Sequence, residues 1–271
     1  MTRLKVSFGE AYRWYVTRAK HPLKNKIVGH WWGWFCKPAV WIRYDDGLVI
    51  KTRLRDYIQR SIFMEGFYEL ELVRWLKLEL HANDVFWDVG ANVGAMTLIA
   101  ARRCKQVISF EPEPRVLARL REHLEVNGLG NVRVMPLALS DTGGRVLMGQ
   151  APEENSGMNS LCRTDLGWNC QEVEAIRADD LVARGDVPCP NVMKVDVEGA
   201  EAMVFGGAPI LLQNPALRVV MFEAALGRDG LPANPELGRI FEESRFTVAH
   251  FARSDTTIHD GMGNFLARRN L

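Results

Sequence analysis

The sequence has few cysteines, and their positions exclude two kinds of stabilised scaffold. The 271-residue chain holds five cysteines, which are scattered, and none of them forms a C-x-x-C pair. A disulfide framework or a structural zinc site is therefore not expected, and a reducing, cytoplasmic environment fits best.

Long hydrophobic runs, internal repeats and low-complexity tracts are also missing. The most apolar early stretch, residues 27–42, is interrupted by His30, Lys37 and Pro38, so we do not expect a membrane-spanning helix there. The start of the chain has no apolar core before a small-residue cleavage site, which argues against a secretory signal. With 47% hydrophobic and 25% charged residues, the composition is typical of a soluble protein with one large domain, with or without an appendage.

Charge is distributed unevenly along the chain. Residues 1–60 hold thirteen Lys and Arg against four Asp and Glu, whereas the remainder holds twenty-one against twenty-nine. Such a basic segment suits an anionic surface, such as a membrane face, a phosphorylated substrate or a nucleic acid. The alternative is a solvated cap whose aromatic side chains pack on the main domain. We therefore divide the chain into a basic N-terminal cap (1–60) and a main domain (61–271). The cap also carries five of the eight tryptophans: Trp14, Trp31, Trp32, Trp34 and Trp41.

The hydrophobic pattern predicts an α/β fold. Residues 8–20 and the stretch GFYELELVRWLKLEL are helical in pattern, and WIRY and LVIK flank a glycine turn as in a hairpin. From residue 84 onward strands alternate with helices, including one predicted helix over 199–214, which indicates a mainly parallel sheet covered on both faces. The last two strands, RFTVAHF and GNFLARR, have no helix between them, so we expect an antiparallel strand at one edge.

The stretch VFWDVGANVG predicts a ligand site, because ligands bind at the carboxyl ends of strands in such sheets. Asn92 stands where a dinucleotide fingerprint has its second glycine, and Asp88 would repel a pyrophosphate. The same carboxylate could instead pair with the amino group of S-adenosylmethionine. Glu111 ends the next strand and could accept both hydroxyls of a ribose, which fits either cofactor. The pattern therefore favours S-adenosylmethionine over a nicotinamide cofactor.

Four stretches, DVGANVG, SFEPEP, NVRVMPLALSD and VMKVDVEGAEAMVFGGA, together resemble the FkbM family of S-adenosylmethionine-dependent methyltransferases. The resemblance covers roughly residues 57 to 267. It implies a class I methyltransferase (Rossmann-like) fold, a seven-stranded sheet with the last strand antiparallel, in which 61–271 is the catalytic domain. It also implies O-methylation of a hydroxyl on a sugar, glycan or secondary metabolite, with S-adenosylhomocysteine as product.

The resemblance also implies positions for the cofactor. The glycine turn after the first strand would surround the methionine part, Glu111 would hold the ribose with Pro112 shaping its turn, and Ser140 and Asp141 would lie beside the adenine. Glu69 could complete the site from the preceding helix, or it could be an exposed helical carboxylate. The residues of the turn itself are Asp88, Gly90, Ala91, Asn92 and Gly94.

A second acidic constellation, KVDVEGAE, supplies the candidate catalytic residues. Lys194, Asp196 and Glu198 alternate and so share one side of a strand that is otherwise expected to be apolar. Asp196 is the first candidate for the base that activates the acceptor hydroxyl and Glu198 the second, while Lys194 could orient the acid or the acceptor. The alternative is a structural Lys194–Asp196 ion pair, with Glu198 starting a helix at its positive end.

Other polar residues are weaker candidates. Asp196, Glu198 and Glu201 offer oxygen ligands for magnesium, but no histidine accompanies them, so we expect no metal. Glu223 ends a further strand and could contact the acceptor or water. His259, Asn264 and the loop 156–160 could also contact the acceptor, or could simply be exposed.

The acceptor is expected to be a small molecule or glycan, and the basic cap favours an anionic one or a peripheral contact with a membrane. A nucleic acid is not expected, because D-V-E-G replaces the N-P-P-Y/F of amino-methylating enzymes and the catalytic part is acidic. A non-catalytic binding module with a methyltransferase fold is a further alternative, which the intact acids Asp88 and Glu111 oppose.

Overall fold

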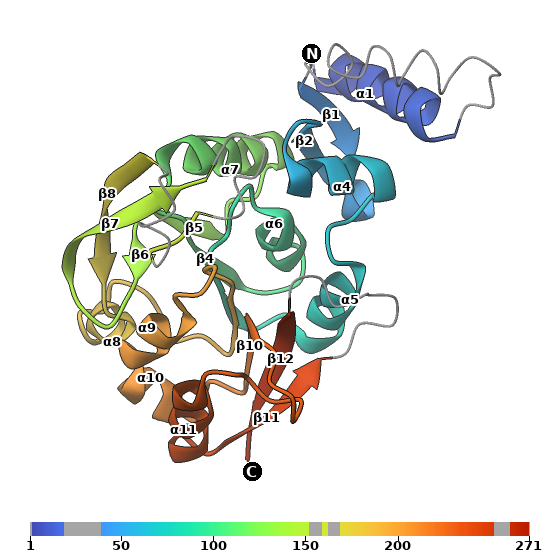
Figure 1. Cartoon of the computed structure of the whole chain (residues 1–271). Coiled ribbons are helices and arrows are strands. Elements are labelled where there is room, and N and C mark those ends of the chain that lie inside the picture. Colours follow the sequence, from blue (N-terminus) through green and yellow to red (C-terminus); the bar gives the residue numbers. More distant parts are fainter. Residues whose placement is uncertain (1, 19–38, 152–158, 162–168, 252–260, 271) are drawn as a thin grey trace.

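The computed structural model describes residues 2–18, 39–151, 159–161, 169–251 and 261–270 (Figure 1). A seven-stranded sheet forms its centre, in the order β11-β12-β10-β9-β3-β4-β5. Neighbours among β3, β4, β5, β9 and β10 pair in parallel, whereas β12 is antiparallel to both of its neighbours. The predicted α/β fold is confirmed. The strands are β3 (Val85–Val89), β4 (Gln106–Phe110), β5 (Val132–Met135), β9 (Val192–Val195), β10 (Val219–Ala225), β11 (Phe246–Phe251) and β12 (Met262–Arg269).

The antiparallel strand exists as predicted, but its place at the edge was wrong. The last strand, β12, lies between β10 and β11, and β11 forms the edge. Burial explains this order, because Phe265 and Ala267 of β12 are fully buried, whereas Thr247, Ala249 and His250 of β11 are exposed. The more apolar strand therefore takes the inner position.

Helices cover both faces of the sheet, and the alternation along each strand divides the core between them. Phe86 packs in one hydrophobic cluster with α5 and α6, and its neighbour Trp87 packs in the other with α9 and α11. The sheet is thus covered on both faces, and only its strand ends remain open for a ligand. The covering helices are α5 (Leu70–Glu79), α6 (Ala95–Ala101), α7 (Pro114–Asn127), α8 (Ala178–Ala183), α9 (Glu201–Gly206), α10 (Pro209–Gln213) and α11 (Pro235–Glu243).

The single helix predicted over 199–214 is wrong, because the structure divides it into α9 and α10. A Cβ atom at Gly207 would lie 2.0 Å from the carbonyl oxygen of Ser140, so the chain needs glycine at this close approach. Pro209 then begins α10 at a position where its missing N–H is harmless. The break lets the chain pass close to Ser140, the residue after Leu139 at the end of a short strand.

The N-terminal residues form helix α1 (Thr2–Thr17) and a hairpin of β1 (Ala39–Arg43) and β2 (Val49–Arg53), joined through the short 3-10 helix η1 (Asp45–Gly47). The hairpin is confirmed, and the helix predicted over 8–20 is present but begins earlier, at Thr2. Helix α4 (Tyr57–Glu65) was not predicted, and residue 60 lies inside it. The buried side chains of Ile50, Leu54 and Phe63 share a core cluster with α5 and α6, and the division of the chain at residue 60 stays a prediction.

A small three-stranded sheet packs beside the main one, in the order β6 (Ala138–Leu139), β8 (Asn169–Ile176), β7 (Gly144–Gln150). Strand β8 pairs in parallel with β6 and antiparallel with β7. Within the described ranges, no helix is both long enough and apolar enough to cross a membrane.

Candidate cofactor and acceptor site

The carboxyl ends of β3, β4, β9 and β10 surround a pocket with two lobes. Counted with the open space at their mouths, the lobes measure about 570 Å³ and 590 Å³. Both are lined by Gly90, Asn92 and Asp196, so a single ligand can extend from one to the other. The apolar lobe is lined further by Val89, Phe110, Glu111, Pro112, Leu137, Ala138, Leu139, Met148, Asn159, Ser160, Leu161, Val197 and Ala200. The acidic lobe is lined further by Ile58, Tyr68, Glu69, Asp88, Ala91, Val93, Ala95, Met96, Lys194, Glu198 and Glu223.

The glycine turn after β3 brings two segments into direct backbone contact. Gly90 has φ of 78°, and a Cβ atom there would lie 1.9 Å from the carbonyl oxygen of Asp196. Only glycine tolerates both the conformation and the contact. Asn92 also lies in the left-handed region, with φ of 50°, and its Oδ1 accepts a 2.7 Å hydrogen bond from the Val93 N–H. The turn is thus fixed before any ligand binds.

Glu111 holds this turn from the end of β4. Its Oε2 accepts a 2.9 Å hydrogen bond from the Asn92 N–H, and its Oε1 accepts one of 2.9 Å from the Glu113 N–H. Burial, together with the nearby Glu113 and Asp88 carboxylates, raises the pKa of Glu111 to about 7 despite these hydrogen bonds. Each carboxylate oxygen can accept a second hydrogen bond, so the pair of ribose hydroxyls remains a suitable partner.

Asp88 is fully buried at the end of β3. Its Oδ2 accepts a 2.5 Å hydrogen bond from Thr97 Oγ1, which also lies 2.9 Å from Ser109 Oγ. Among the described residues no group donates to its Oδ1, although Lys194 Nζ lies 4.0 Å away. Burial raises the pKa of Asp88, and Lys194 and Thr97 only partly oppose this. A buried carboxylate oxygen without a donor fits the amino group of S-adenosylmethionine, as the sequence suggested.

Lys194 joins Asp88 to Asp196, which follows β9. The strand ends at Val195 and Glu198 has a positive φ of 56°, so the prediction that Lys194, Asp196 and Glu198 share one side of a strand was wrong. Asp88 and Lys194 are register partners on β3 and β9, and Lys194 Nζ lies 3.0 Å from Asp196 Oδ2. Burial lowers the pKa of Lys194, but the carboxylates of Asp196 and Asp88 outweigh burial and raise it overall. The ammonium therefore stays charged and orients Asp196.

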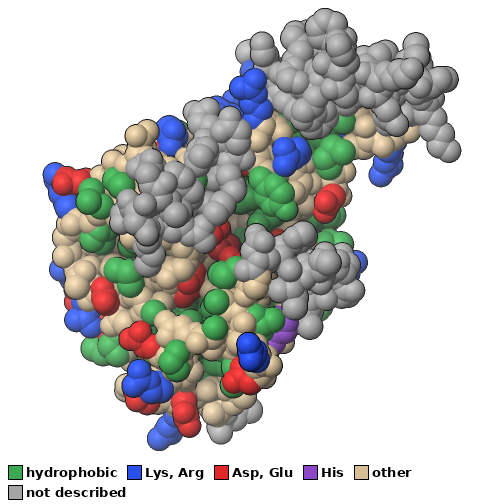
Figure 2. All heavy atoms as spheres, viewed as in Figure 1, with side chains coloured by type: hydrophobic (Ala, Val, Ile, Leu, Met, Phe, Trp, Pro, Cys, Tyr) green, Lys and Arg blue, Asp and Glu red, His purple; other side chains and the backbone are tan. Residues whose placement is uncertain are grey.

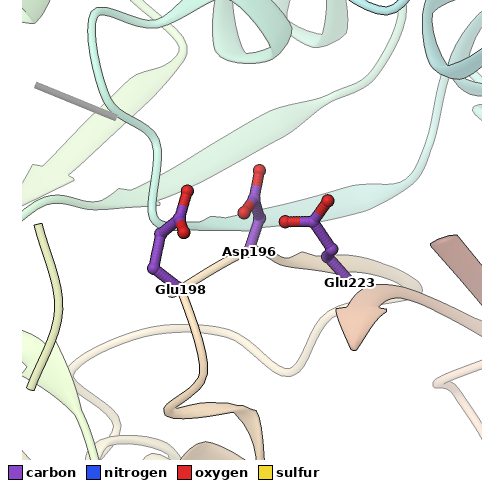
Figure 3. Close-up of side chains that lie close together, drawn as sticks. All are labelled: Asp196, Glu198 and Glu223. Carbon is purple, nitrogen blue, oxygen red and sulfur yellow. The ribbon is translucent and has the colours of Figure 1, made fainter. Parts of the chain in front are cut away.

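Three carboxylates meet at the mouth of the acidic lobe (Figure 3). Oxygens of Asp196, Glu198 and Glu223 lie within 4.8 Å of one another. Burial, followed by repulsion from Asp196 and Glu198, raises the pKa of Glu223 to about 8. Such a group can either share a proton or accept a cation, so these are the described residues that could hold a divalent ion.

The sequence suggested Asp196, Glu198 and Glu201 as possible magnesium ligands, and the structure excludes Glu201 from this set. Glu201 Oε1 accepts hydrogen bonds of 3.2 Å from the N–H groups of Val197 and Gly199, so its carboxylate holds the loop after β9. Glu223, on the neighbouring strand β10, takes the third place instead. The parallel pairing of β10 with β9 brings Glu223 to the same edge of the sheet as Asp196.

The structure brings most of the predicted site residues together, but not all. Gly94 caps α6, where a Cβ atom would meet Leu120 at 2.5 Å, so it serves helix packing and does not line either lobe. Ser140 is buried and donates its N–H to the Ile176 carbonyl, and Asp141 is exposed; neither lines a lobe. Those that do line a lobe are Glu69, Asp88, Gly90, Ala91, Asn92, Glu111, Pro112, Lys194, Asp196 and Glu198.

Some of the weaker acceptor-contact candidates also lie at the site. Asn264 is the register partner of Glu223 on β12, so the two side chains share one face of the sheet. Of the loop 156–160, Asn159 and Ser160 line the apolar lobe, and Ser160 Oγ donates to the Glu198 carbonyl at 2.7 Å. His259 and residues 156–158 lie outside the described residues.

Sequence reasoning missed the apolar residues of the site. Leu137 and Leu139 follow β5, and Met148 comes from the small sheet, yet all three line the apolar lobe. The only signal was the apolar stretch PLAL at the end of the predicted strand NVRVMPLAL, and such a stretch is also typical of ordinary core. Ile58 of α4 was missed because α4 itself was not predicted.

Comparison with known proteins finds similar methyltransferases. A family model described as the methyltransferase FkbM domain matches residues 88–250. The chain is 32% identical over 158 residues to the hexuronic acid methyltransferase AglP of Haloferax volcanii, covering 58% of this chain and 64% of AglP, which is less than two thirds of its length. It is 28% identical over 189 residues to the 2-O-methyltransferase NoeI of Sinorhizobium fredii, covering 60% of this chain and 73% of NoeI. The crystal structure of methyltransferase FkbM from Methylobacillus flagellatus KT is similar with a TM-score of 0.48 and 12% identity, covering 98% of this chain and 59% of that one.

Proposed function

The chain belongs to the FkbM methyltransferase family, and from that premise we propose that it methylates a hydroxyl group of a sugar or glycan with S-adenosylmethionine. The names of two relatives, a hexuronic acid methyltransferase and a 2-O-methyltransferase, support transfer to a sugar oxygen. The observation that carries the proposal is the pair of joined lobes, one apolar and one lined by carboxylates. A secondary metabolite with similar hydroxyls is the other acceptor that this geometry accommodates.

The apolar lobe would hold the adenosine part of the cofactor and the shared turn its methionine part. Glu111 would accept the ribose hydroxyls, and Leu137, Leu139 and Met148 would pack against the adenine. Asp88 would accept from the cofactor's amino group through the oxygen that has no donor among the described residues. When bound, S-adenosylmethionine supplies an electrophilic methyl group for the acceptor in the adjacent acidic lobe.

The acidic lobe would bind the acceptor and remove its proton. A hydroxyl becomes a better nucleophile when a positioned base accepts its proton, and the best base has a pKa near the working pH. Glu223, whose pKa burial and neighbouring acids raise to about 8, meets that requirement at the mouth of the lobe. Asp196, held by Lys194 at 3.0 Å, would accept from the hydroxyl and orient it, with Glu198 as a further acceptor.

The same charges bear on the nature of the acceptor. The described lining of the acidic lobe has five carboxylates, those of Glu69, Asp88, Asp196, Glu198 and Glu223, and Lys194 is its only cationic side chain. Carboxylates accept hydrogen bonds and repel anions, so a group rich in hydroxyl donors suits the lobe best. The reacting part of the acceptor is thus uncharged in this proposal, and any anionic part would lie outside the lobe. The predicted cytoplasmic location remains part of the proposal.

Calorimetric titration with S-adenosylmethionine, S-adenosylhomocysteine and NAD tests the cofactor assignment directly. Binding of NAD without binding of the sulfonium cofactor would refute it. Transfer of labelled methyl groups to a panel of neutral and acidic glycosides, with and without chelator, tests the reaction. Cofactor binding without turnover on any hydroxyl acceptor would favour a non-catalytic binding module.

A further inference from the structure

Helix α1 packs on the hairpin with one side and exposes large aromatic side chains on the other. Val6, Gly9 and Val16 are buried, and a Cβ atom at Gly9 would lie 1.8 Å from the carbonyl oxygen of Trp41. On the outer half of the helix, Phe8 is 64% exposed and Trp14 is 60% exposed. Exposed aromatic surface of this kind is typical of an interaction site.

A groove between α1 and the hairpin continues this surface. It is lined by Lys5 and Phe8 from the helix and by Ala39, Val40, Trp41 and Lys51 from the hairpin. Lys51 Nζ lies 5.7 Å from the Trp41 ring centroid, which mixes an ammonium group with an aromatic face. Aromatic and basic side chains side by side are typical of proteins that lie at the headgroup level of a membrane.

The acids of this region have partners, while many of its bases are exposed. Glu10 accepts from the Arg43 N–H at 2.7 Å, Asp45 pairs with Lys77, and Asp46, which is 69% exposed, lies 3.2 Å from Arg103. Figure 2 shows basic side chains at the end of the molecule that carries α1 and acidic ones near the middle of the same face. The exposed bases of α1 and the hairpin with its following turn are Lys5, Arg18, Arg43, Arg53 and Arg55.

We propose that α1 and the hairpin, residues 2–18 and 39–55, form a docking module for the surface of an anionic lipid bilayer. Phe8 and Trp14 enter the headgroup region, and the exposed bases contact lipid phosphates. A nucleic acid could also use aromatic and basic groups, but residues 61–271 carry a net charge of −8, which repels a long polyanion. A bilayer touches only the end of the molecule where the docking module lies (Figure 1).

The docking module is connected to the catalytic site by α4, which follows the hairpin and contributes Ile58 to the acidic lobe. Docking would therefore bring the acceptor side of the pocket close to the lipid surface. Membrane docking does not depend on the proposed methyl transfer, since it rests on the exposed side of α1 and the charges around it.

Vesicle co-sedimentation of the 271-residue chain tests the inference. We expect binding to vesicles of phosphatidylcholine with phosphatidylglycerol, little binding to phosphatidylcholine alone, and loss of binding at high salt. Phe8→Ala with Trp14→Ala, or Lys5→Glu with Arg18→Glu, should weaken binding roughly tenfold. Matched controls are Leu78→Ala at a side chain 84% exposed on α5, and Arg145→Glu at one 81% exposed on β7, which should bind as wild type.

Cofactor affinity measured on the same samples shows that each variant is folded. Equal binding of the α1 variants and wild type would overturn the inference, as would equal binding to neutral and anionic vesicles. The last experiment adds a single-stranded oligonucleotide. If it binds tightly to the variant with both aromatic substitutions and displaces the vesicles, the membrane inference is also overturned.

Discussion

The acidic lobe and the docking module lie next to each other and have opposite charge. They also differ in the exposure of their charged groups to solvent. In the lobe, Asp88 and Lys194 are buried and tied to fixed neighbours. In the module, Lys5 and Arg18 are exposed to solvent. Buried charges act at short range with little screening, whereas exposed charges act at longer range and are screened by salt. The lobe is therefore suited to chemistry and the module to association.

The largest effect should come from Glu223→Gln. Glutamine keeps the size of the side chain but cannot accept the hydroxyl proton, so kcat should fall by about 10² or more. Steady-state kinetics on an acceptor from the glycoside panel would measure this, and the rise of rate with pH should be lost. Cofactor affinity should stay within a few-fold, and Trp14→Ala in the docking module should leave transfer to a soluble acceptor unchanged. If Glu223→Gln retains turnover, the base is Asp196 or Glu198 and not Glu223.

Gly90→Ala should come next, because it disturbs the contact that places the acids beside the cofactor turn. The new Cβ atom would meet the Asp196 carbonyl oxygen at 1.9 Å, so cofactor affinity should fall by about 10²-fold or the fold itself should weaken. Gly128→Ala is the control, since Gly128 also has a positive φ of 63° but no atom within 4 Å of the place its Cβ would take. Thermal unfolding and calorimetry measure both variants. If Gly90→Ala and Gly128→Ala have equal effects, the positive φ alone explains the need for glycine at position 90.

Asp88→Asn should weaken S-adenosylmethionine binding by about tenfold or more, because the cofactor's amino group loses a charged acceptor. Asp141→Asn provides the comparison, as Asp141 is exposed and lines neither lobe. Calorimetry at neutral pH measures both. A loss at Asp141 with none at Asp88 would restore the sequence-based position of Asp141 beside the adenine and reject the pairing at Asp88.

A smaller effect should appear in the pH dependence of stability. The folded pKa of Glu223 is about 8 against an ordinary value of 4.5, so the folded state binds the proton more tightly than the unfolded state. Its contribution to the free energy of unfolding is therefore complete below about pH 4.5 and is lost as pH rises through about 8. Urea unfolding between these limits should show a shallower decline for Glu223→Gln than for wild type or for Glu242→Gln, at an exposed position on α11. Parallel curves would contradict the raised pKa.

The smallest effect should be that of salt on cofactor binding. Raising the salt concentration should change S-adenosylmethionine affinity by less than about twofold, since Asp88 and Glu111 are shielded from solvent. Vesicle binding by the docking module should fall strongly over the same range. Equal salt dependence of the two would remove the distinction between the regions.

The sequence predicted which strand ends carry the chemistry better than the exact set of side chains. Asp88, Glu111 and Asp196 lie at the ends of strands whose apolar pattern is clear, so their common edge could be inferred. Glu223 also ends a strand and was expected at that edge, but its place beside Asp196 comes from the pairing of β10 with β9, which no local pattern shows. The position of β12 between β10 and β11 was missed for the same reason.

Local geometry explains the other differences. Ser140 follows an apolar stretch, as an adenine contact would, but it is fully buried and its carbonyl lies against Gly207. The break between α9 and α10 depends on that same approach, which no periodicity reveals. Apolar lining residues such as Met148 carry no chemical signature, so only the folded chain distinguishes them from core.

The backbone contact between Gly90 and Asp196 has a consequence for engineering new substrate selectivity. Because the two loops touch without an intervening side chain, shifting the loop of Asp196 to suit another acceptor would displace the donor's binding turn as well. Ile58 and Tyr68 reach the same lobe from separate elements that lack this contact. Libraries that vary those two walls are the better route to altered acceptor preference with the donor site left intact.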